Sequence, residues 1–259
     1  MSKIFCSKEK AVNDWIKNNN MEDFVLKDYI LFKITNRFFF DIYNHYSYIK
    51  IEDHDLEEMP ENIINNTRLN RLIIYNSKIE TLSVSFGDLT NLQNLELDNN
   101  KIKSLPESFC KLSNLFSLGL NWNQLESLPE YFGNLSKLKY LGLVSNKLKS
   151  LPDSFGDLSN LKIANFNINK LESLPESFCN LQKLRTLKLN DNKIGSLRES
   201  FCNLSKLTFL GLGNNKLVSL PESFGNLSNL EHLYLDRNEI ESFPNSIVNL
   251  SKLVGFCFE

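Results

Sequence analysis

Long apolar runs are absent from the sequence, and so is a recognisable leader. No stretch approaches the roughly 18 uncharged apolar residues that a membrane-spanning helix requires. The opening residues, MSKIFCSKEK, hold one short apolar patch followed by charges rather than the apolar core of a secretory signal. We therefore expect a soluble cytoplasmic protein with no membrane partner; the alternative is a protein that is translocated without a signal peptide.

Cysteine, histidine and the sequence motifs of catalysis are also scarce. The five cysteines are an odd number, and without a secretory signal we expect them to be reduced thiols. The three histidines form no obvious metal site, and the phosphate-binding, dinucleotide-binding and zinc-protease motifs do not occur. We accordingly predict no catalytic residue, no metal site and no cofactor, and we expect that the protein is not an enzyme.

Neither sign of charge predominates, and glycine and proline are few. The 29 basic and 31 acidic residues give a net charge of -2, so we expect no nucleic-acid partner. Ten glycines and seven prolines, together with 42% hydrophobic residues, exclude collagen-like and disordered chains. The composition is that of an ordinary globular protein, so the information lies in the order of the residues.

A 23-residue repeat provides that order. Written in lines of 23 residues from Tyr46, the chain shows one pattern nine times, of which LSNLFSLGLNWNQLESLPEYFGN, residues 112–134, is an example. All seven prolines fall in one position of the repeat, a phenylalanine recurs three residues later, and an asparagine recurs in a third position. The phenylalanine column is Phe86, Phe109, Phe132, Phe155, Phe178, Phe201 and Phe224, and the asparagine column is Asn100, Asn123, Asn146, Asn169, Asn192, Asn215 and Asn238.

Each column predicts a structural role. The alternation in Leu118, Gly119 and Leu120 is typical of a half-buried strand, and one strand per repeat in a constant direction gives a parallel sheet. Proline lacks an N–H group and therefore marks the turn that leaves the sheet. The phenylalanines should stack in the core, and the asparagines should form a buried ladder, because a carboxamide both donates and accepts hydrogen bonds. Cys110, Cys179 and Cys202 occupy a position filled mostly by glycine elsewhere, so we interpret them as small-residue replacements.

The pattern L-x-x-L-x-L-x-x-N-x-L, followed by x-x-L-P-x-x-F-x-x-L, resembles the leucine-rich repeat family in its 23-residue form, from Tyr46 to the C-terminus. Among members of the family, the chain is most similar to intracellular and bacterial scaffolds. The resemblance implies an α/β solenoid of horseshoe shape, with a parallel concave β-sheet of about ten strands and a convex side of turns and short helical segments. It also implies that a protein or peptide binds on the concave sheet.

The repeat divides the chain into three parts. Residues 1–45 do not fit it and are predicted to form an N-terminal cap, with a short helix over residues 8–19 and a hairpin made of residues 29–34 and 37–43. Residues 46–252 hold nine repeats, and residues 253–259 begin a tenth. In that partial repeat, Phe256 and Phe258 match strand leucines without a polar cap after them. We expect this edge to be covered by a second copy of the chain in a homodimer, to be covered by another partner, or to be truncated.

The residues that flank the strand leucines should point out of the sheet and form its binding face. Gly119 and Gly142 lie side by side in the middle of that face, and glycine within a strand is typical of a place where a ligand comes close. We predict a shallow groove on repeats four to six with Trp122 and Tyr140 as anchors. The other partner-binding residues of this groove are Gly119, Gly142, Val144, Ile163 and Ile168. The alternative is that the glycines are neutral variation and that Trp122 packs on its neighbours.

Two further clusters are candidate sites. The second comprises Phe209, Gly211, Gly213, His232 and Tyr234, and a weaker third comprises Tyr48, Ile73 and Tyr75. Cys257 should lie diagonally across from His232, and such a pair is ~7–8 Å apart, which is too far for a nucleophile and its base. We therefore expect a non-enzymatic scaffold that binds a protein or peptide. The alternatives are recognition of a glycan or lipid, and the targeting module of a secreted bacterial effector.

Overall fold

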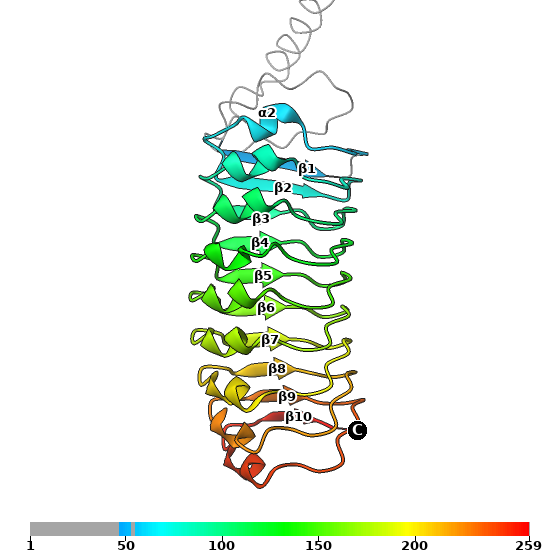
Figure 1. The fold of residues 1–259 in the computed structure, drawn as a ribbon, viewed down its shortest axis with the longest axis vertical. Coiled ribbons are helices and arrows are strands. Elements are labelled where there is room, and N and C mark those ends of the chain that lie inside the picture. Colours follow the sequence, from blue (N-terminus) through cyan, green and yellow to red (C-terminus); the bar gives the residue numbers. More distant parts are fainter. Residues whose placement is uncertain (1–46, 53–54, 259) are drawn as a thin grey trace, which may run out of the picture.

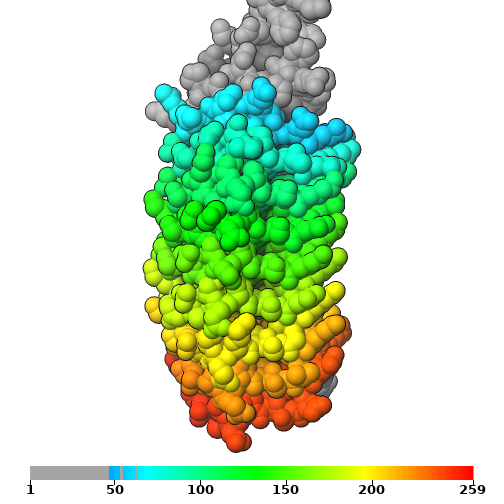
Figure 2. Space-filling view, viewed as in Figure 1, coloured from blue at the N-terminus to red at the C-terminus, as the bar shows by residue number. Residues whose placement is uncertain are grey.

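The computed structural model of the chain describes residues 47–52 and 55–258. The predicted cap, with its helix at residues 8–19 and its hairpin at residues 29–34 and 37–43, lies outside the described residues. Within the described part, the repeats stack along the long axis of the molecule in the order of the sequence (Figure 1). The space-filling view shows the same order, because each repeat forms its own band across the surface (Figure 2).

Ten parallel strands form one sheet whose order is the order of the chain (Figure 1). Neighbouring strands pair with a constant offset, as in Tyr140 opposite Ile163 and Gly119 opposite Gly142, so the predicted columns and their register are confirmed. The sheet is open, as expected for the repeat solenoid, since β1 and β10 stand at its two ends. The strands are β1 (Tyr48–Glu52), β2 (Arg71–Tyr75), β3 (Asn94–Glu96), β4 (Ser117–Gly119), β5 (Tyr140–Gly142), β6 (Ile163–Asn165), β7 (Thr186–Lys188), β8 (Phe209–Gly211), β9 (His232–Tyr234) and β10 (Gly255–Cys257).

Short helices form the side of the solenoid opposite the sheet, where helical segments were expected. Pro106 and Pro152 precede two of them with φ of -67°, and the carbonyl oxygen of each accepts the first hydrogen bond of the turn. Proline suits this position because its ring fixes φ and the missing N–H group would have no partner there. The helices are α2 (Glu61–Ile64) and the 3₁₀ helices η2 (Val84–Asp88), η3 (Glu107–Lys111), η4 (Phe132–Asn134), η5 (Asp153–Asp157), η6 (Glu176–Asn180), η7 (Glu199–Asn203), η8 (Phe224–Asn226) and η9 (Asn245–Asn249).

The core between the sheet and the helices is a continuous stack of leucine and phenylalanine side chains. Every member of the phenylalanine column is buried, which confirms the predicted core. The rings of Phe132, Phe155 and Phe178 lie parallel, with centroids 6.1 and 5.7 Å apart. Each ring therefore loses its contact with water only because the neighbouring repeats cover both of its faces.

The asparagine column forms the predicted buried ladder. The side-chain amide of Asn146 donates hydrogen bonds to the carbonyl oxygens of Leu120 and Leu143, at 2.9 and 3.2 Å. Its oxygen accepts a bond of 3.0 Å from the N–H group of Leu125. The same pattern recurs from Asn100 to Asn238, so each amide satisfies backbone groups that would otherwise be buried without partners. In the second repeat the slot holds Ser77, whose hydroxyl is buried without a hydrogen-bond partner.

The residue that follows each column phenylalanine, here called the small-residue slot, limits how closely neighbouring helices approach. A Cβ atom added at Gly156 would lie 2.1 Å from the backbone oxygen of Ser177 in the next repeat, so only glycine permits this spacing. Where the slot holds Cys179, the following pair of rings, Phe178 and Phe201, lies 6.5 Å apart. A hollow of about 280 Å³ opens between η6 and η7 at this point. The cysteines do replace glycine, as predicted. At Cys179, the larger side chain coincides with a wider separation between the neighbouring helices.

The buried cysteines are poor nucleophiles. Burial, reinforced by the charge of Glu107, raises the pKa of the Cys110 thiol to about 11. Burial likewise raises the pKa of the Cys202 thiol. Because the thiolate is the reactive form, both side chains act as small apolar groups at neutral pH.

Candidate interaction surface

The face of the sheet that points away from the core carries the candidate site, and we call it the open sheet face. Along β5 the burial alternates, with Tyr140 exposed, Leu141 buried and Gly142 half-buried. The same alternation in the other strands places the predicted columns on this face.

Apolar side chains are exposed at the rim where the central strands begin. Tyr140 and Ile163 are 37% and 38% exposed, and they face each other across β5 and β6. Phe116, which sequence reasoning missed, is 36% exposed, and its ring centroid lies 5.2 Å from that of Tyr140. The ammonium group of Lys139 lies 4.5 Å from the centroid of the Phe116 ring. The signal in the sequence was an aromatic residue at a position that the next two repeats fill with lysine.

A second set of exposed apolar side chains lies at the opposite rim, where the strands end. Trp122 is 55% exposed and Ile168 is 51% exposed, whereas Val144 in the neighbouring column is half-buried. Both exposed residues lie in the left-handed region, with φ of 52° and 59°. Among the described residues this conformation occurs eight times, each directly before the ladder position. Four of these residues are Asn or Asp: Asn76, Asn99, Asp191 and Asn214.

The left-handed conformation makes Trp122 and Ile168 costly choices for their position. For a residue with a Cβ atom it costs roughly 1–2 kcal/mol, and the short polar side chains of Asn and Asp reduce that cost by local hydrogen bonding. A β-branched residue such as Ile168 is especially unfavourable there. Neither side chain repays the cost by burial, because both are about half exposed. Their exposure in a backbone conformation that disfavours them makes Trp122 and Ile168 candidates for a functional role.

The two central glycines do not leave a bare floor between the rims. A Cβ atom at Gly119 would lie 2.9 Å from Oδ1 of Asp98, and one at Gly142 would lie 2.8 Å from the Asn121 amide. The Asp98 carboxylate accepts bonds of 2.8 Å from the backbone and side-chain N–H groups of Asn121, whose own oxygen accepts a bond of 2.9 Å from Val144 N–H. The glycines thus make room for polar side chains of the preceding repeat, and the floor is polar.

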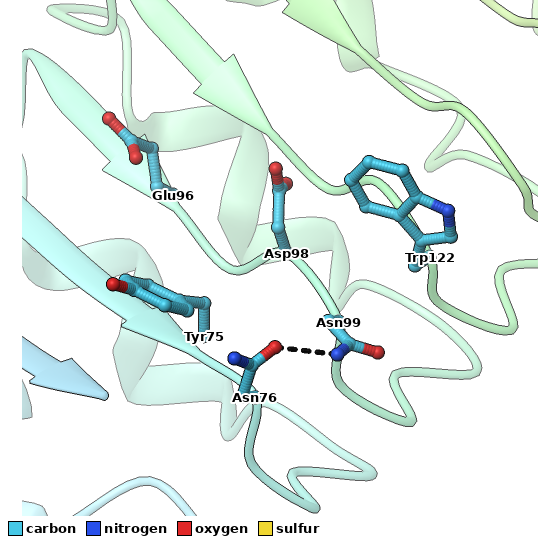
Figure 3. A pocket seen from close by; sticks show the side chains of 6 residues that line it. All are labelled: Tyr75, Asn76, Glu96, Asp98, Asn99 and Trp122. Atoms are coloured by element: carbon cyan, nitrogen blue, oxygen red, sulfur yellow. Dashed lines mark hydrogen bonds between the residues drawn. The ribbon is translucent and has the colours of Figure 1, made fainter. Parts of the chain in front are cut away.

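The hollow beside Trp122 lies on the side of the earlier repeats. It is open, has a volume of about 490 Å³, and is lined by Tyr75, Asn76, Glu96, Asp98, Asn99 and Trp122 (Figure 3). Asp98 stands between Glu96 and Trp122 in this view, and the Asn99 amide donates a bond of 2.5 Å to Asn76. The structure therefore joins Trp122 to repeats two and three, and Tyr140 does not line this hollow.

The charges around the hollow are unevenly paired. Lys50 and Glu52 lie 2.8 Å apart beside Tyr75, and hydrogen bonding to Lys50 lowers the pKa of the Glu52 carboxyl. Arg71 approaches Glu96 at 3.5 Å. Burial raises the pKa of the Asp98 carboxyl, an effect that the bonds from Asn121 only partly oppose.

The second predicted cluster forms a compact aromatic group. The ring of Phe209 lies 5.9 Å from that of His232 and 5.3 Å from that of Tyr234, and Lys188 lies 5.4 Å above the Phe209 ring. Nδ1 of His232 is buried without a hydrogen-bond partner. Gly211 and Gly213 are buried beneath neighbouring polar side chains, so this cluster offers less accessible surface than the central repeats.

The third predicted cluster is wrong in part. Tyr48 and Ile73 were expected on the open sheet face but are buried, and the guanidinium group of Arg71 lies 5.1 Å from the centroid of the Tyr48 ring. The register assigned both residues to the correct face of the sheet, but it does not indicate which long side chains, such as Arg71, cover their neighbours. Only Tyr75 of this cluster lines the hollow beside Trp122.

Across residues 47–52 and 55–258, no group of three or more His, Cys, Asp or Glu side chains is placed to hold a metal ion. No helix in the described part of the chain has the length and apolar character needed to cross a membrane.

Profiles described as leucine-rich repeat match residues 67–125, 165–217 and 229–250. No curated protein sequence matches the chain. Among solved structures, the chain is similar to a leucine-rich repeat protein of Leptospira interrogans, with 30% identity and a TM-score of 0.79 over 88% of this chain. The match covers 58% of the Leptospira chain, so this chain spans less than two thirds of that relative.

Two further structures extend the comparison. The plant peptide hormone receptor RGFR1, solved in complex with RGF2, is 28% identical, with a TM-score of 0.71 over 81% of this chain and 35% of the receptor chain. The leucine-rich repeat domain of the type III effector XopL is 23% identical, with a TM-score of 0.75 over 82% of this chain and 76% of that domain. At 23% identity, the similarity to the XopL domain establishes a shared fold and nothing more.

Proposed function

The chain belongs to the leucine-rich repeat family, and from this premise we propose that it is a non-enzymatic scaffold that binds a protein or peptide on its open sheet face. The similar plant receptor was solved in complex with RGF2, which is consistent with binding to a repeat solenoid of this kind. Ten strands spaced ~4.8 Å apart give a face roughly 45 Å long, which is large enough for a folded partner or an extended peptide.

One observation carries the proposal: exposed apolar side chains concentrate on the central repeats of this face, and two of them occupy backbone positions that disfavour them. Phe116, Tyr140 and Ile163 border one rim, and Trp122 and Ile168 border the other. Aromatic anchors around a polar centre are typical of the residues that dominate binding energy in protein interfaces. We therefore assign partner binding to repeats four to six.

The test compares two tyrosines of the same region. Tyr140 lies on the open sheet face, and Tyr131 is exposed beside η4 on the opposite side of the solenoid. With a partner identified and purified, Tyr140→Ala should weaken binding at least tenfold, since a central aromatic anchor contributes about 2 kcal/mol or more. Tyr131→Ala should leave the affinity unchanged. If the two variants bind alike, the partner does not use this face.

We also propose that the exposed edge of β10 is covered by a second copy of the chain. Val254, Phe256 and Phe258 are exposed at this edge, and the rings of Phe256 and Phe258 pack with Phe243 in one aromatic group. An exposed strand edge that carries apolar side chains is a template for pairing. Two copies of the same edge can meet about a two-fold axis, which is the commonest symmetry of homodimers.

A further inference from the structure

The hollow beside Trp122 is lined by both aromatic and acidic side chains. Its walls combine two aromatic rings, Tyr75 and Trp122, with two carboxylates, Glu96 and Asp98 (Figure 3). The four side chains come from three consecutive repeats, and Figure 3 shows Asp98 between Glu96 and Trp122. The hollow is open to solvent, so a side chain of a bound partner can enter it.

The charge of this hollow is incompletely balanced. The carboxylates of Glu52 and Glu96 have cations nearby, Lys50 at 2.8 Å and Arg71 at 3.5 Å. Among the described residues, no cation lies within ion-pair distance of Asp98, whose carboxylate accepts hydrogen bonds only from Asn121. Each oxygen of that carboxylate accepts one bond and so keeps further capacity as an acceptor. A partially desolvated carboxylate without a counter-charge favours a cationic ligand.

The aromatic wall indicates which cation fits. The Trp122 side chain is more than half exposed, and an indole is the ring that attracts cations most strongly. A guanidinium group is planar, so it can lie against the indole while its edge donates to a carboxylate. The ammonium group of lysine is a compact, strongly hydrated charge and matches this pair of surfaces less well.

We propose that the hollow formed by Tyr75, Glu96, Asp98 and Trp122 binds an arginine side chain of the partner, with the guanidinium group between the Trp122 indole and the Asp98 carboxylate. This proposal rests on the proposed function, because it names the chemistry of one partner side chain on the same face. Trp122 then supplies the stacking surface, Asp98 supplies the charge, and Tyr75 and Glu96 bound the remaining sides.

The experiment uses the full chain labelled with ¹⁵N and two blocked tripeptides as probes, acetyl-Gly-Arg-Gly-amide and its citrulline counterpart. Citrulline has the shape of arginine without its charge. The indole N–H signal of Trp122, assigned by its loss in Trp122→Asn, should shift and saturate with the arginine probe, with a dissociation constant on the order of 1 mM. The citrulline probe should bind at least tenfold more weakly. Equal binding of the two probes, or no saturable shift with the arginine probe, overturns the proposal.

Two variants locate the charge. Asp98→Asn should weaken binding of the arginine probe about tenfold, because the charge-assisted hydrogen bond is lost. Asp236→Asn changes an aspartate in the same column, six repeats away, and should leave the affinity unchanged. Thermal unfolding of both variants verifies that each is folded. Unaltered binding by folded Asp98→Asn overturns the assignment.

The outcomes separate this proposal from the proposed function. If the arginine probe fails while Tyr140→Ala still weakens partner binding, the scaffold function stands and the arginine site is wrong. If the arginine probe binds as expected while Tyr140→Ala has no effect on the partner, the hollow is an arginine site but the partner lies elsewhere.

Discussion

In the part of the chain that the structure describes, eight residues have positive φ, one in each of eight consecutive repeats. Each lies directly before the ladder position, which is asparagine in seven of these repeats. The turn out of each strand imposes this conformation, whatever residue occupies the slot. Asn and Asp tolerate it, whereas Trp122 and Ile168 hold it at a cost in stability. Trp122 and Ile168 therefore lower the stability of the fold, and because both side chains are about half exposed, burial does not compensate for that loss.

Replacing the unfavourable residues by asparagine should stabilise the fold. We expect Trp122→Asn and Ile168→Asn each to raise the free energy of unfolding by about 1 kcal/mol, because asparagine adopts the left-handed conformation more readily. Urea unfolding followed by circular dichroism measures the change. The reciprocal substitution Asn99→Ile serves as the control and should lower stability by a similar amount. A loss of stability in Ile168→Asn would show that packing of the isoleucine outweighs its backbone cost.

At this scale, the sequence predicted positions better than conformations. The repeat register placed Trp122, Tyr140 and Ile163 on the open sheet face, and all three are exposed there. It did not reveal that the space above Gly119 is filled by Asp98, because a side-chain rotamer depends on hydrogen bonds between repeats and not on spacing. Phe116 was missed for a simpler reason: it lies one residue before the column that was considered to face the partner.

At the scale of elements, the small-residue slot controls the approach of neighbouring 3₁₀ helices. Glycine lets the backbone oxygen of the next repeat come close, as at Gly156 and Ser177, whereas Cys179 is followed by a wider gap and a hollow between η6 and η7. The spacing between neighbouring helices thus varies along the solenoid while the sheet keeps one register. The wider gap accompanies the replacement of glycine by Cys179 in the slot.

Adding one methyl group in this slot should be costly. Gly156→Ala would place a Cβ atom 2.1 Å from the Ser177 oxygen, so the helices must separate, and we expect a loss of about 1–3 kcal/mol in unfolding free energy. Gly195→Ala is the matched control, because no atom lies within 4 Å of its added Cβ; its effect should stay within about 0.5 kcal/mol. Differential scanning calorimetry of the two variants distinguishes them, and equal melting temperatures would contradict the role given to the slot.

The elements themselves were largely predictable from the repeat. Proline and asparagine mark the two bends of most units, since one removes a backbone donor and the other supplies bonds to buried backbone groups. The 3₁₀ form of the helices was not predicted, because the choice between helix types within three to five residues depends on packing against the next repeat.

At the scale of the whole molecule, the end strands of the sheet differ from those in its middle, because within the described part of the chain β1 and β10 each pair with a strand on one side only. The core of an interior repeat is covered on both sides by its neighbours, whereas apolar side chains at β10, the last strand that the structure describes, are exposed. Stability in such a stack is a sum of repeat and interface contributions, so an added interface at an end is directly stabilising.

The proposed homodimer follows at this scale. Sedimentation of the full chain should show a monomer–dimer equilibrium, and Phe256→Glu should shift it to monomer because a charge then enters the apolar contact. Val84→Glu, which changes an exposed valine in η2 far from the edge, should leave the equilibrium unchanged. A wild-type chain that stays monomeric at high concentration would refute the pairing of β10 edges.

The asparagine ladder also has a direction. The amide of Asn146 bonds to Leu120, Leu125 and Leu143, all of which precede it in the chain, and Asn123 likewise bonds to Leu97 and Ile102. Every such amide finds its partners already synthesised when it leaves the ribosome. The repeats can therefore fold one after another from the N-terminal side during synthesis. Each new repeat then forms its asparagine hydrogen bonds with backbone groups that have already been synthesised.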